Sequence, residues 1–197
     1  MLTLSHRIAL DPTPAQRIAL ARAAGCARVA WNWGLAEWKR QYKALKADPT
    51  LAKPCGMALR KTWNAAKHGL YPWMKESPKD ANIESLFDLE AAFRNFYAKR
   101  AKYPRFKVKG RDAPSFGLSN DKFRFDGCKV RLPVIGWVKT REALRFAGKI
   151  LTGRVTHTAG RWFLSVAVEA DHLRPPAPEG SIVGVDLGVR ALATLSD

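Results

Sequence analysis

The apolar positions first alternate along the chain and then follow helical spacing. Residues 2–10 alternate closely enough to predict a strand. The candidates for its buried face are Leu2, Leu4, Ile8 and Leu10. Thr13, Pro14 and Gln16 then form a capping-box pattern with a proline suited to the first helical turn. A helix is therefore expected to begin at about residue 14.

Helical spacing continues to about residue 101. Gly25 is expected to break the first helical stretch into two helices, because glycine is a poor residue for a helix interior. The second of these has apolar residues at intervals of three and four, namely Ala27, Trp31, Leu35, Trp38 and Tyr42. Two further helices are expected, over residues 58–67 and from Ser77 to about Ala101.

After Gly110 the pattern becomes strand-like. Short alternating runs separated by turn residues predict about six strands. They cover residues 116–119, 122–125, 128–132, 134–138, 149–158 and 161–170. Asp126-Gly127 and Ala159-Gly160 are expected to form tight hairpin turns. We expect an α+β fold in which a small antiparallel barrel, joined by the N-terminal strand, contains the helices as an insertion.

The last segment of the chain follows a stiff linker at Pro175-Pro176-Ala177-Pro178. Residues 181–187 form a mostly apolar run, and a second run over 189–195 returns after Gly188. Asp186 lies near the end of the first predicted strand. A carboxylate there is costly unless something binds it, and a divalent metal is a frequent reason, although an Asp before a Gly is also ordinary turn chemistry.

The charge of the chain points to a polyanionic partner. Lys and Arg number 34 against 17 Asp and Glu, which gives a formal net charge of +17. With 47% hydrophobic residues and 7 Trp, the chain is expected to be folded. No run is long and apolar enough to span a bilayer, and no signal peptide is evident. Three distant cysteines predict neither a disulfide framework nor a zinc site.

One stretch concentrates this charge without an acidic residue. Between positions 94 and 111, eight basic residues alternate with the aromatic residues Phe96, Tyr97, Tyr103 and Phe106. The candidate nucleic-acid-binding residues are Arg94, Lys99, Arg100, Lys102, Arg105, Lys107, Lys109 and Arg111. Basic groups neutralise phosphates and aromatic rings stack on bases, so we expect a nucleic-acid face here. A solvated helix end with buried aromatic residues is the alternative.

The tryptophan-rich helix permits two interpretations. Helical spacing places Trp31 and Trp38 on one side of the helix, where they are expected to belong to the core. Trp33 points elsewhere, and we include it among the candidate nucleic-acid-binding residues.

Several separated motifs together resemble one family. In order they are Trp31-Asn32-Trp33, Pro72-Trp73, the helix over 89–97, Tyr103-Pro104-Arg105-Phe106-Lys107 and the segment 184–197. The chain resembles the TnpB proteins of the IS200/IS605 OrfB family, which are transposon-encoded RNA-guided nucleases related to type V CRISPR nucleases. The segment around Asp186 resembles the first catalytic motif of a RuvC-type, RNase H-like nuclease domain.

The resemblance implies a domain plan and a set of partners. It implies a first barrel strand (1–10), a helical recognition lobe (11–102), the rest of a wedge-type barrel (103–172), a linker (173–180) and the start of a RuvC domain (181–197). It also implies guide RNA and double-stranded DNA as partners, Mg²⁺ as the cofactor held by Asp186, and a cytoplasmic, nucleoid-associated bacterial protein. Base pairing would read the target sequence, and the protein would read shape and a short flanking motif.

The sequence also departs from that family. A nuclease centre of this class needs several carboxylates to hold two Mg²⁺ ions. The later Glu and Asp of the family, and its four-cysteine zinc element, are not in this sequence. We therefore expect a truncated or split protein that binds RNA and DNA, does not cleave DNA alone and possesses an incomplete metal site. A missing C-terminal half would then be a further partner.

Other functions stay open at this stage. A stand-alone RNA or DNA binder that represses transcription is the second interpretation, because nothing in residues 1–180 separates it from the nuclease. An rRNA-binding protein is the third. A helix-turn-helix over residues 14–46 receives little weight, because the stripe of Trp31, Leu35 and Trp38 favours packing over groove reading.

Overall fold

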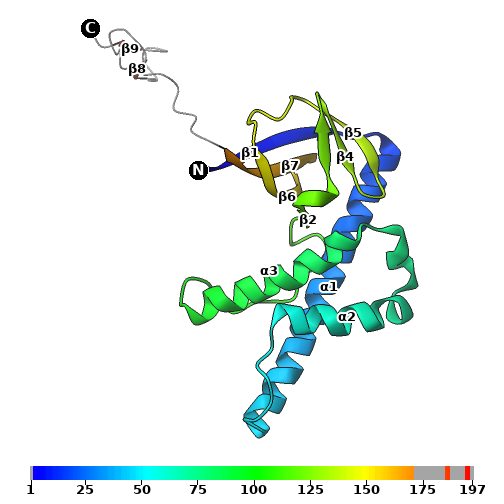
Figure 1. Ribbon diagram of the computed structural model, residues 1–197, viewed down its shortest axis with the longest axis vertical. Helices are drawn as coiled ribbons and strands as arrows, with labels where there is room; N and C mark the ends of the chain where they lie inside the picture. Colours follow the sequence, from blue (N-terminus) through cyan, green and yellow to red (C-terminus); the bar gives the residue numbers. More distant parts are fainter. Residues whose placement is uncertain (1, 171–184, 187–193, 196–197) are drawn as a thin grey trace.

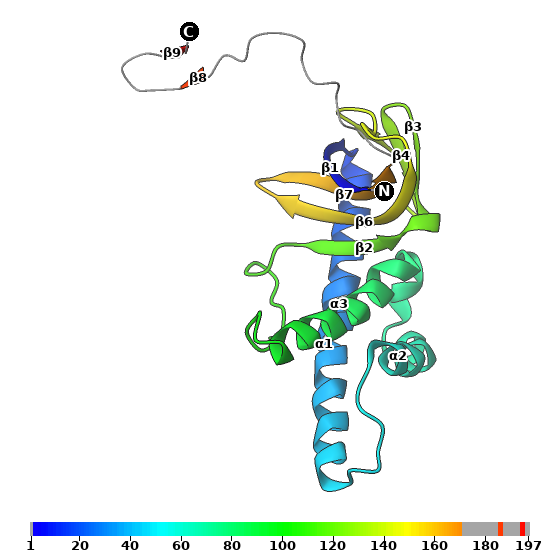
Figure 2. The ribbon, with the colours of Figure 1, turned by 60° about the vertical axis from the view of Figure 1, so that its left-hand side comes forward.

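A seven-stranded antiparallel sheet and three α-helices make up the α+β fold of the computed structural model, which describes residues 2–170, 185–186 and 194–195 (Figure 1, Figure 2). The helical elements are α1 (Pro14–Ala47), α2 (Gly56–Leu70), the 3-10 helix η1 (Pro72–Glu76), α3 (Lys79–Tyr97) and the 3-10 helix η2 (Asn120–Lys122). The strands of the main sheet are β1 (Leu2–Asp11), β2 (Ser115–Ser119), β3 (Arg124–Asp126), β4 (Lys129–Leu132), β5 (Gly136–Thr140), β6 (Lys149–Thr158) and β7 (Arg161–Ala170).

The N-terminal strand joins the two halves of the sheet. The strand order is β2-β6-β7-β1-β5-β4-β3. Most of β1 pairs with β7, from Leu2 opposite Ala170 to Ala9 opposite Phe163, and its last two residues pair with β5. The predicted insertion of the helices between the first strand and the remaining strands is therefore the observed chain order.

The sheet curves but does not close into the predicted barrel. Its edges are β2 and β3, which are not paired with each other. The short helix η2 turns the chain between them, and the buried ring of Phe123 packs at this corner over Gly153, where a Cβ would lie 2.6 Å from the ring. At this corner, the Phe123 side chain fills the space between β2 and β3, which form no backbone hydrogen bonds with each other.

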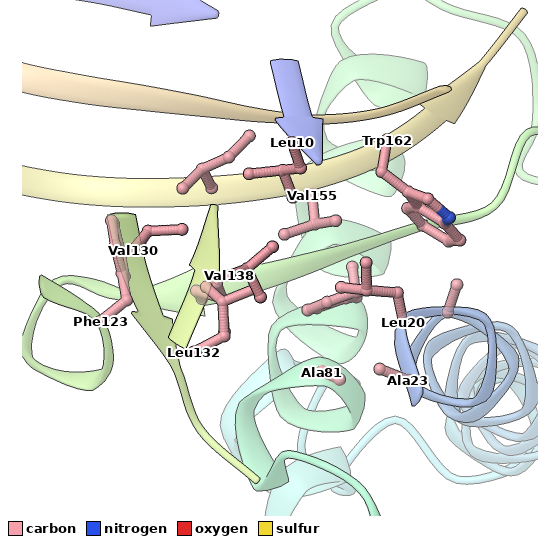
Figure 3. Close-up of a cluster of buried hydrophobic side chains, with 14 of the residues drawn as sticks. Leu10, Leu20, Ala23, Ala81, Phe123, Val130, Leu132, Val138, Val155 and Trp162 are labelled. Carbon is pink, nitrogen blue, oxygen red and sulfur yellow. The ribbon is translucent and has the colours of Figure 1, made fainter. Parts of the chain in front are cut away.

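Two hydrophobic clusters hold the helices and the sheet together. In the first, Leu20 and Ala23 of α1 and Ala81 of α3 pack against the inner face of the sheet, where Val138 and Val155 lie (Figure 3). In the second, the helices pack on one another, around the residues Trp31, Leu35, Trp38, Leu59, Trp63, Leu86, Leu89 and Phe93. The prediction that Trp31 and Trp38 are core residues is confirmed.

The helical region differs from its prediction at two places. The expected break at Gly25 is wrong, because α1 runs without interruption from Pro14 to Ala47. Gly25 costs a helix about 1 kcal/mol, and α1 offsets this by burying neighbours such as Ala24 and Cys26. The end of α3 is Tyr97, earlier than the predicted Ala101, because Lys99 adopts a left-handed conformation with φ of 57°. The capping box at Thr13 and Gln16 is confirmed.

Most strands lie where alternation predicts them. The bounds of β6 and β7 are those predicted, and both residues of their turn, Ala159 and Gly160, have positive φ as a tight hairpin requires. The predicted strand over 122–125 is instead η2 followed by β3.

Near the end of the chain, β8 (Val185–Asp186) pairs antiparallel with β9 (Thr194–Leu195) in a separate two-stranded sheet. These pairs agree with the predicted return of the second apolar run. Outside the described residues lie the linker 173–180 and the rest of the two runs between residues 181 and 193. Within the described part of the chain, no helix is long and apolar enough to cross a membrane.

Candidate nucleic-acid interface

The basic run begins where α3 ends in a tight reversal. The Ala98 N–H donates to the Arg94 carbonyl, the Lys99 N–H to the Phe96 carbonyl and the Arg100 N–H to the Asn95 carbonyl. This is the Schellman pattern, with Lys99 in the left-handed position that glycine usually occupies. The reversal leaves Arg94, Lys99 and Arg100 exposed at the negative end of the helix dipole.

The chain then runs alongside α1, which holds it by side-chain hydrogen bonds. The Trp31 indole N–H donates to the Arg105 carbonyl at 2.9 Å. The Asn32 carboxamide donates to the Lys107 carbonyl at 2.9 Å and accepts from the Lys107 N–H at 2.8 Å. Asn32 therefore pairs with Lys107 much as a neighbouring strand would.

Lys107 differs from the other basic residues of the run. Its ammonium lies 4.0 Å from the centroid of the Trp31 ring, and the side chain is half-buried. Burial lowers the pKa of this ammonium, while the carboxylate of Asp88 acts in the opposite direction. The cation–π contact gives Lys107 a packing role. Its predicted contact with nucleic acid stays a prediction.

Asp112, which the sequence analysis did not single out, organises the end of the run. Its carboxylate accepts from the Val108 N–H at 2.7 Å, from Arg105 at 3.0 Å and from Arg111 at 3.1 Å. The charges of Arg105 and Arg111 are thus partly compensated inside the protein. The only signal in the sequence is that an aspartate directly follows the basic run.

The contacts of Asp112 make local stability depend on pH. The Val108 N–H, and then the nearby Arg111 and Arg105, hold the pKa of this carboxyl below its ordinary value. Such a group stabilises the fold above its unfolded pKa of about 4, and the contribution is lost as the pH falls through the folded pKa. Asp112→Asn should therefore melt below the wild type near neutral pH, and the difference should vanish in acid.

Thermal melting from neutral to strongly acidic pH measures this effect. Asp126→Asn is a matched control, because Asp126 is exposed and forms no ion pair within the residues that the structure describes. A difference between the Asp112 variant and the wild type that stays constant down to acidic pH would contradict the assigned contacts.

Five of the eight candidate basic residues remain available to an outside partner. Arg94, Lys99, Arg100, Lys102 and Lys109 are exposed. None of them has an ion pair within residues 2–170. We call these five residues, together with the exposed rings of Tyr97, Tyr103 and Phe106, the α3-end surface.

The aromatic rings of the α3-end surface are anchored from beneath. The buried ring of Phe93 contacts both Tyr97 and Tyr103, and the Lys39 ammonium lies 4.9 Å from the Phe106 centroid. Tyr97, Tyr103 and Phe106 are 56%, 46% and 44% exposed, so part of each ring faces solvent. Anchored rings beside uncompensated cations suit the stacking of bases and the binding of phosphates.

Trp33 lies apart from these residues. Its half-buried ring packs against Trp63 of α2, with centroids 4.9 Å apart. Trp63 is fully buried and donates its indole N–H to Asn82. A nucleic-acid contact of Trp33 stays a prediction, beside the packing contact that the structure shows.

Asp186 lies in β8, opposite Thr194 of β9. A two-metal nuclease centre needs several carboxylates. Within the described residues, no three His, Cys, Asp or Glu side chains are grouped so that they could hold a metal ion. These residues therefore do not fit a two-metal centre, and no cleavage step is assigned to them. Metal binding by Asp186 stays a prediction.

Comparison with known proteins supplies the context of this surface. The model of a family described as "Helix-turn-helix domain", HTH_OrfB_IS605, matches residues 1–46. Here these residues form β1 and nearly all of α1, which is one continuous helix.

Full-length relatives also match the chain. It is 32% identical over 98% of its length to "Putative RNA-guided DNA endonuclease InsQ" of Escherichia coli. It is 34% identical over 98% of its length to "Putative RNA-guided DNA endonuclease Rv2885c" of Mycobacterium tuberculosis. A Streptomyces pristinaespiralis protein with the same general description is 28% identical over 94% of the chain. The chain spans 47%, 48% and 46% of these relatives, which is about half their length.

Proposed function

This chain belongs to the IS605 OrfB family of TnpB-like transposon proteins, and from that premise we propose that it binds RNA and DNA as the recognition part of an RNA-guided DNA endonuclease. The α3-end surface would contact the sugar-phosphate backbone and unpaired bases. Base pairing with a guide RNA would supply the sequence specificity, so the protein would need no base-reading helix.

One observation carries the proposal. Five exposed cations without acidic partners in the described part of the chain occur in one short segment with three anchored aromatic rings, in a protein of net charge +17. Uncompensated surface charge of one sign repels itself and is relieved when phosphates bind and release their counterions. The half-compensated Arg105 and Arg111 would position the segment more than bind the ligand.

The finer parts of the family plan belong to the same proposal. The curved sheet would act as the wedge domain, residues 11–102 as the recognition lobe and residues 181–197 as the start of a RuvC domain. Asp186 would contribute to a Mg²⁺ site together with carboxylates outside the described residues. Binding of nucleic acid is the function that the described residues themselves support.

Replacing three residues of the α3-end surface tests this function. The variant Lys99→Ala/Arg100→Ala/Lys102→Ala should bind RNA at least about tenfold more weakly. Its slope of log affinity against log salt should fall by about 2, since each single-strand phosphate contact contributes about 0.7. Fluorescence anisotropy over a range of salt concentrations measures both quantities.

A control variant with the same loss of charge separates a site from general attraction. Lys53, Lys61 and Lys75 are exposed and have no ion pair in the described part of the chain. Their triple alanine variant should bind almost as the wild type does. If both variants lost the same amount of RNA affinity, binding would depend on the overall positive charge of the protein and not on the α3-end surface.

The RNA that copurifies with the chain identifies the partner. A transcript from a transposon end would support the guide-RNA proposal. Ribosomal RNA would instead favour an rRNA-binding protein, and the absence of bound RNA would remove the guide-RNA part of the proposal.

A further inference from the structure

A second basic and aromatic group lies on the outer face of the sheet. Strand register places Arg124 of β3 opposite Arg131 of β4, and Arg131 opposite Trp137 of β5. These three exposed side chains therefore form one row across three strands, which we call the arginine row. The Arg124 guanidinium lies 5.6 Å from the centroid of the Trp137 ring.

The arginine row is uncompensated. Like charges directly opposite each other destabilise a sheet. Neither Arg124 nor Arg131 forms an ion pair with any residue of the described ranges. The two facing guanidinium groups therefore have no acidic partner within the described residues, although that of Arg124 lies near the Trp137 ring.

The next row of the same face provides an internal comparison. Register places its four residues in the order Asp126, Lys129, Lys139 and Asp11. Two carboxylates flank two ammonium groups, so this row is neutral as a whole. Acidic residues therefore do occur on this face of the sheet, but the arginine row contains none.

A surface hollow lies beside the arginine row. It has a volume of about 490 Å³ and is lined in part by the ion pair of Asp121 and Lys122 and by Arg124, Arg131 and Val134. Val134 is 67% exposed and has φ of 66°, an uncommon conformation for a β-branched residue. Two arginines, an exposed indole and an open hollow thus occur together on the three consecutive strands β3, β4 and β5.

We propose that the arginine row binds an unpaired nucleotide, with its phosphate between the guanidinium groups of Arg124 and Arg131 and its base against Trp137. Two guanidinium groups offer the planar donors that phosphate oxygens accept. A base can stack on an exposed ring only when its own face is free, which excludes bases inside a duplex. This inference rests on the proposed function and adds a second contact, on elements other than the α3-end surface.

Three variants of the full chain test the arginine row by anisotropy with labelled single strands. Arg124→Gln/Arg131→Gln should bind a uridine decamer about tenfold more weakly, and the salt slope should fall by about 0.7, because the contact with one phosphate is lost. Trp137→Leu should weaken binding at least about fivefold without changing the slope, because stacking releases no counterions. Lys129→Gln/Lys139→Gln removes the same charge from the neutral row and should leave the affinity within about twofold.

A thymidine decamer and a blunt RNA duplex complete the experiment. If the arginine variant loses more affinity for the uridine decamer, the site is assigned to RNA. If it loses more affinity for the thymidine decamer, the site is assigned to DNA. Trp137→Leu should not change duplex binding. Equal losses in the arginine and lysine variants, or unchanged single-strand binding by Trp137→Leu, would overturn the proposal.

The fold of the variants and the proposed function are checked separately. The arginine variant should melt close to the wild-type temperature, because the removal of a repulsive pair offsets the loss of the contact between Arg124 and Trp137. If the arginine variant binds as tightly as the wild type, the proposed role of the arginine row is wrong, while the proposed function stands. A wild type that binds none of the three nucleic acids overturns the proposed function and this inference together.

Discussion

Replacing Trp38 by alanine should lower the free energy of unfolding by about 3–5 kcal/mol, the range for removing a buried tryptophan side chain. Trp38 is 6% exposed, and its ring stacks on that of Phe93 with centroids 4.3 Å apart and planes inclined by 8°. Because Phe93 also supports Tyr97 and Tyr103, the loss should extend to the α3-end surface. Urea denaturation measures the change in stability.

Two further variants show whether the effect belongs to the core. Trp73 is 49% exposed, so Trp73→Ala should cost less than about 1 kcal/mol. Trp38→Phe keeps an aromatic ring against Phe93 and should retain much of the stability. If Trp38→Ala melts as the wild type does but binds RNA weakly, Trp38 acts as a stacking platform and the packing account is wrong.

Replacing Asn32 by alanine should cost about 2–4 kcal/mol, because it leaves the N–H and the carbonyl of Lys107 without their partner. Those two bonds, at 2.8 and 2.9 Å, hold the extended segment on α1 across 75 positions of sequence. The amide hydrogen of Lys107 should then exchange at the rate of an exposed amide. Hydrogen exchange followed by NMR measures it directly.

Asn32→Asp separates the two bonds. An aspartate can accept from the Lys107 N–H but cannot donate to the Lys107 carbonyl, so this variant should also lose stability. Asn95→Ala, at an exposed position of α3, is the control and should leave the exchange of Lys107 unchanged. A Lys107 amide that stays protected in Asn32→Ala would show that other contacts hold the segment.

The α3-end surface and the arginine row, the two proposed binding surfaces, share the same physical basis. In each, cations that have no ion pair within the described ranges occur with partly exposed aromatic rings. In the first case, Arg105 and Arg111 of the same run share Asp112; in the second, the neighbouring row of the sheet has a formal charge of zero. This contrast, more than the total charge, is what separates a binding surface from a basic exterior.

The structure also changes how the basic run is understood. In the sequence, the eight basic residues between positions 94 and 111 look equivalent. The structure divides them into three kinds by the contacts of their side chains. Five are free in the described part of the chain, Arg105 and Arg111 share Asp112, and Lys107 lies on Trp31. Variants of the run should therefore differ in effect, although each removes one positive charge.

Most of the local elements could be predicted from the amino-acid sequence. Alternation and the Ala159-Gly160 turn predict β6 and β7 to the residue, the Thr13 capping box predicts the start of α1, and helical spacing predicts Trp31 and Trp38 in the core. These features depend on neighbours within a few positions, where periodicity and turn chemistry act. The family resemblance rests on motifs of the same local kind.

Contacts between residues far apart in the sequence became known only from the folded chain. Helix α1 continues through Gly25, because the burial of neighbouring residues outweighs the low helix propensity of glycine. The tertiary structure pairs Asn32 with Lys107, and it aligns Arg124, Arg131 and Trp137 through strand register. A shift of register by one residue would turn those side chains to the other face. Such contacts depend on how whole elements pack, and no short stretch of sequence contains that information.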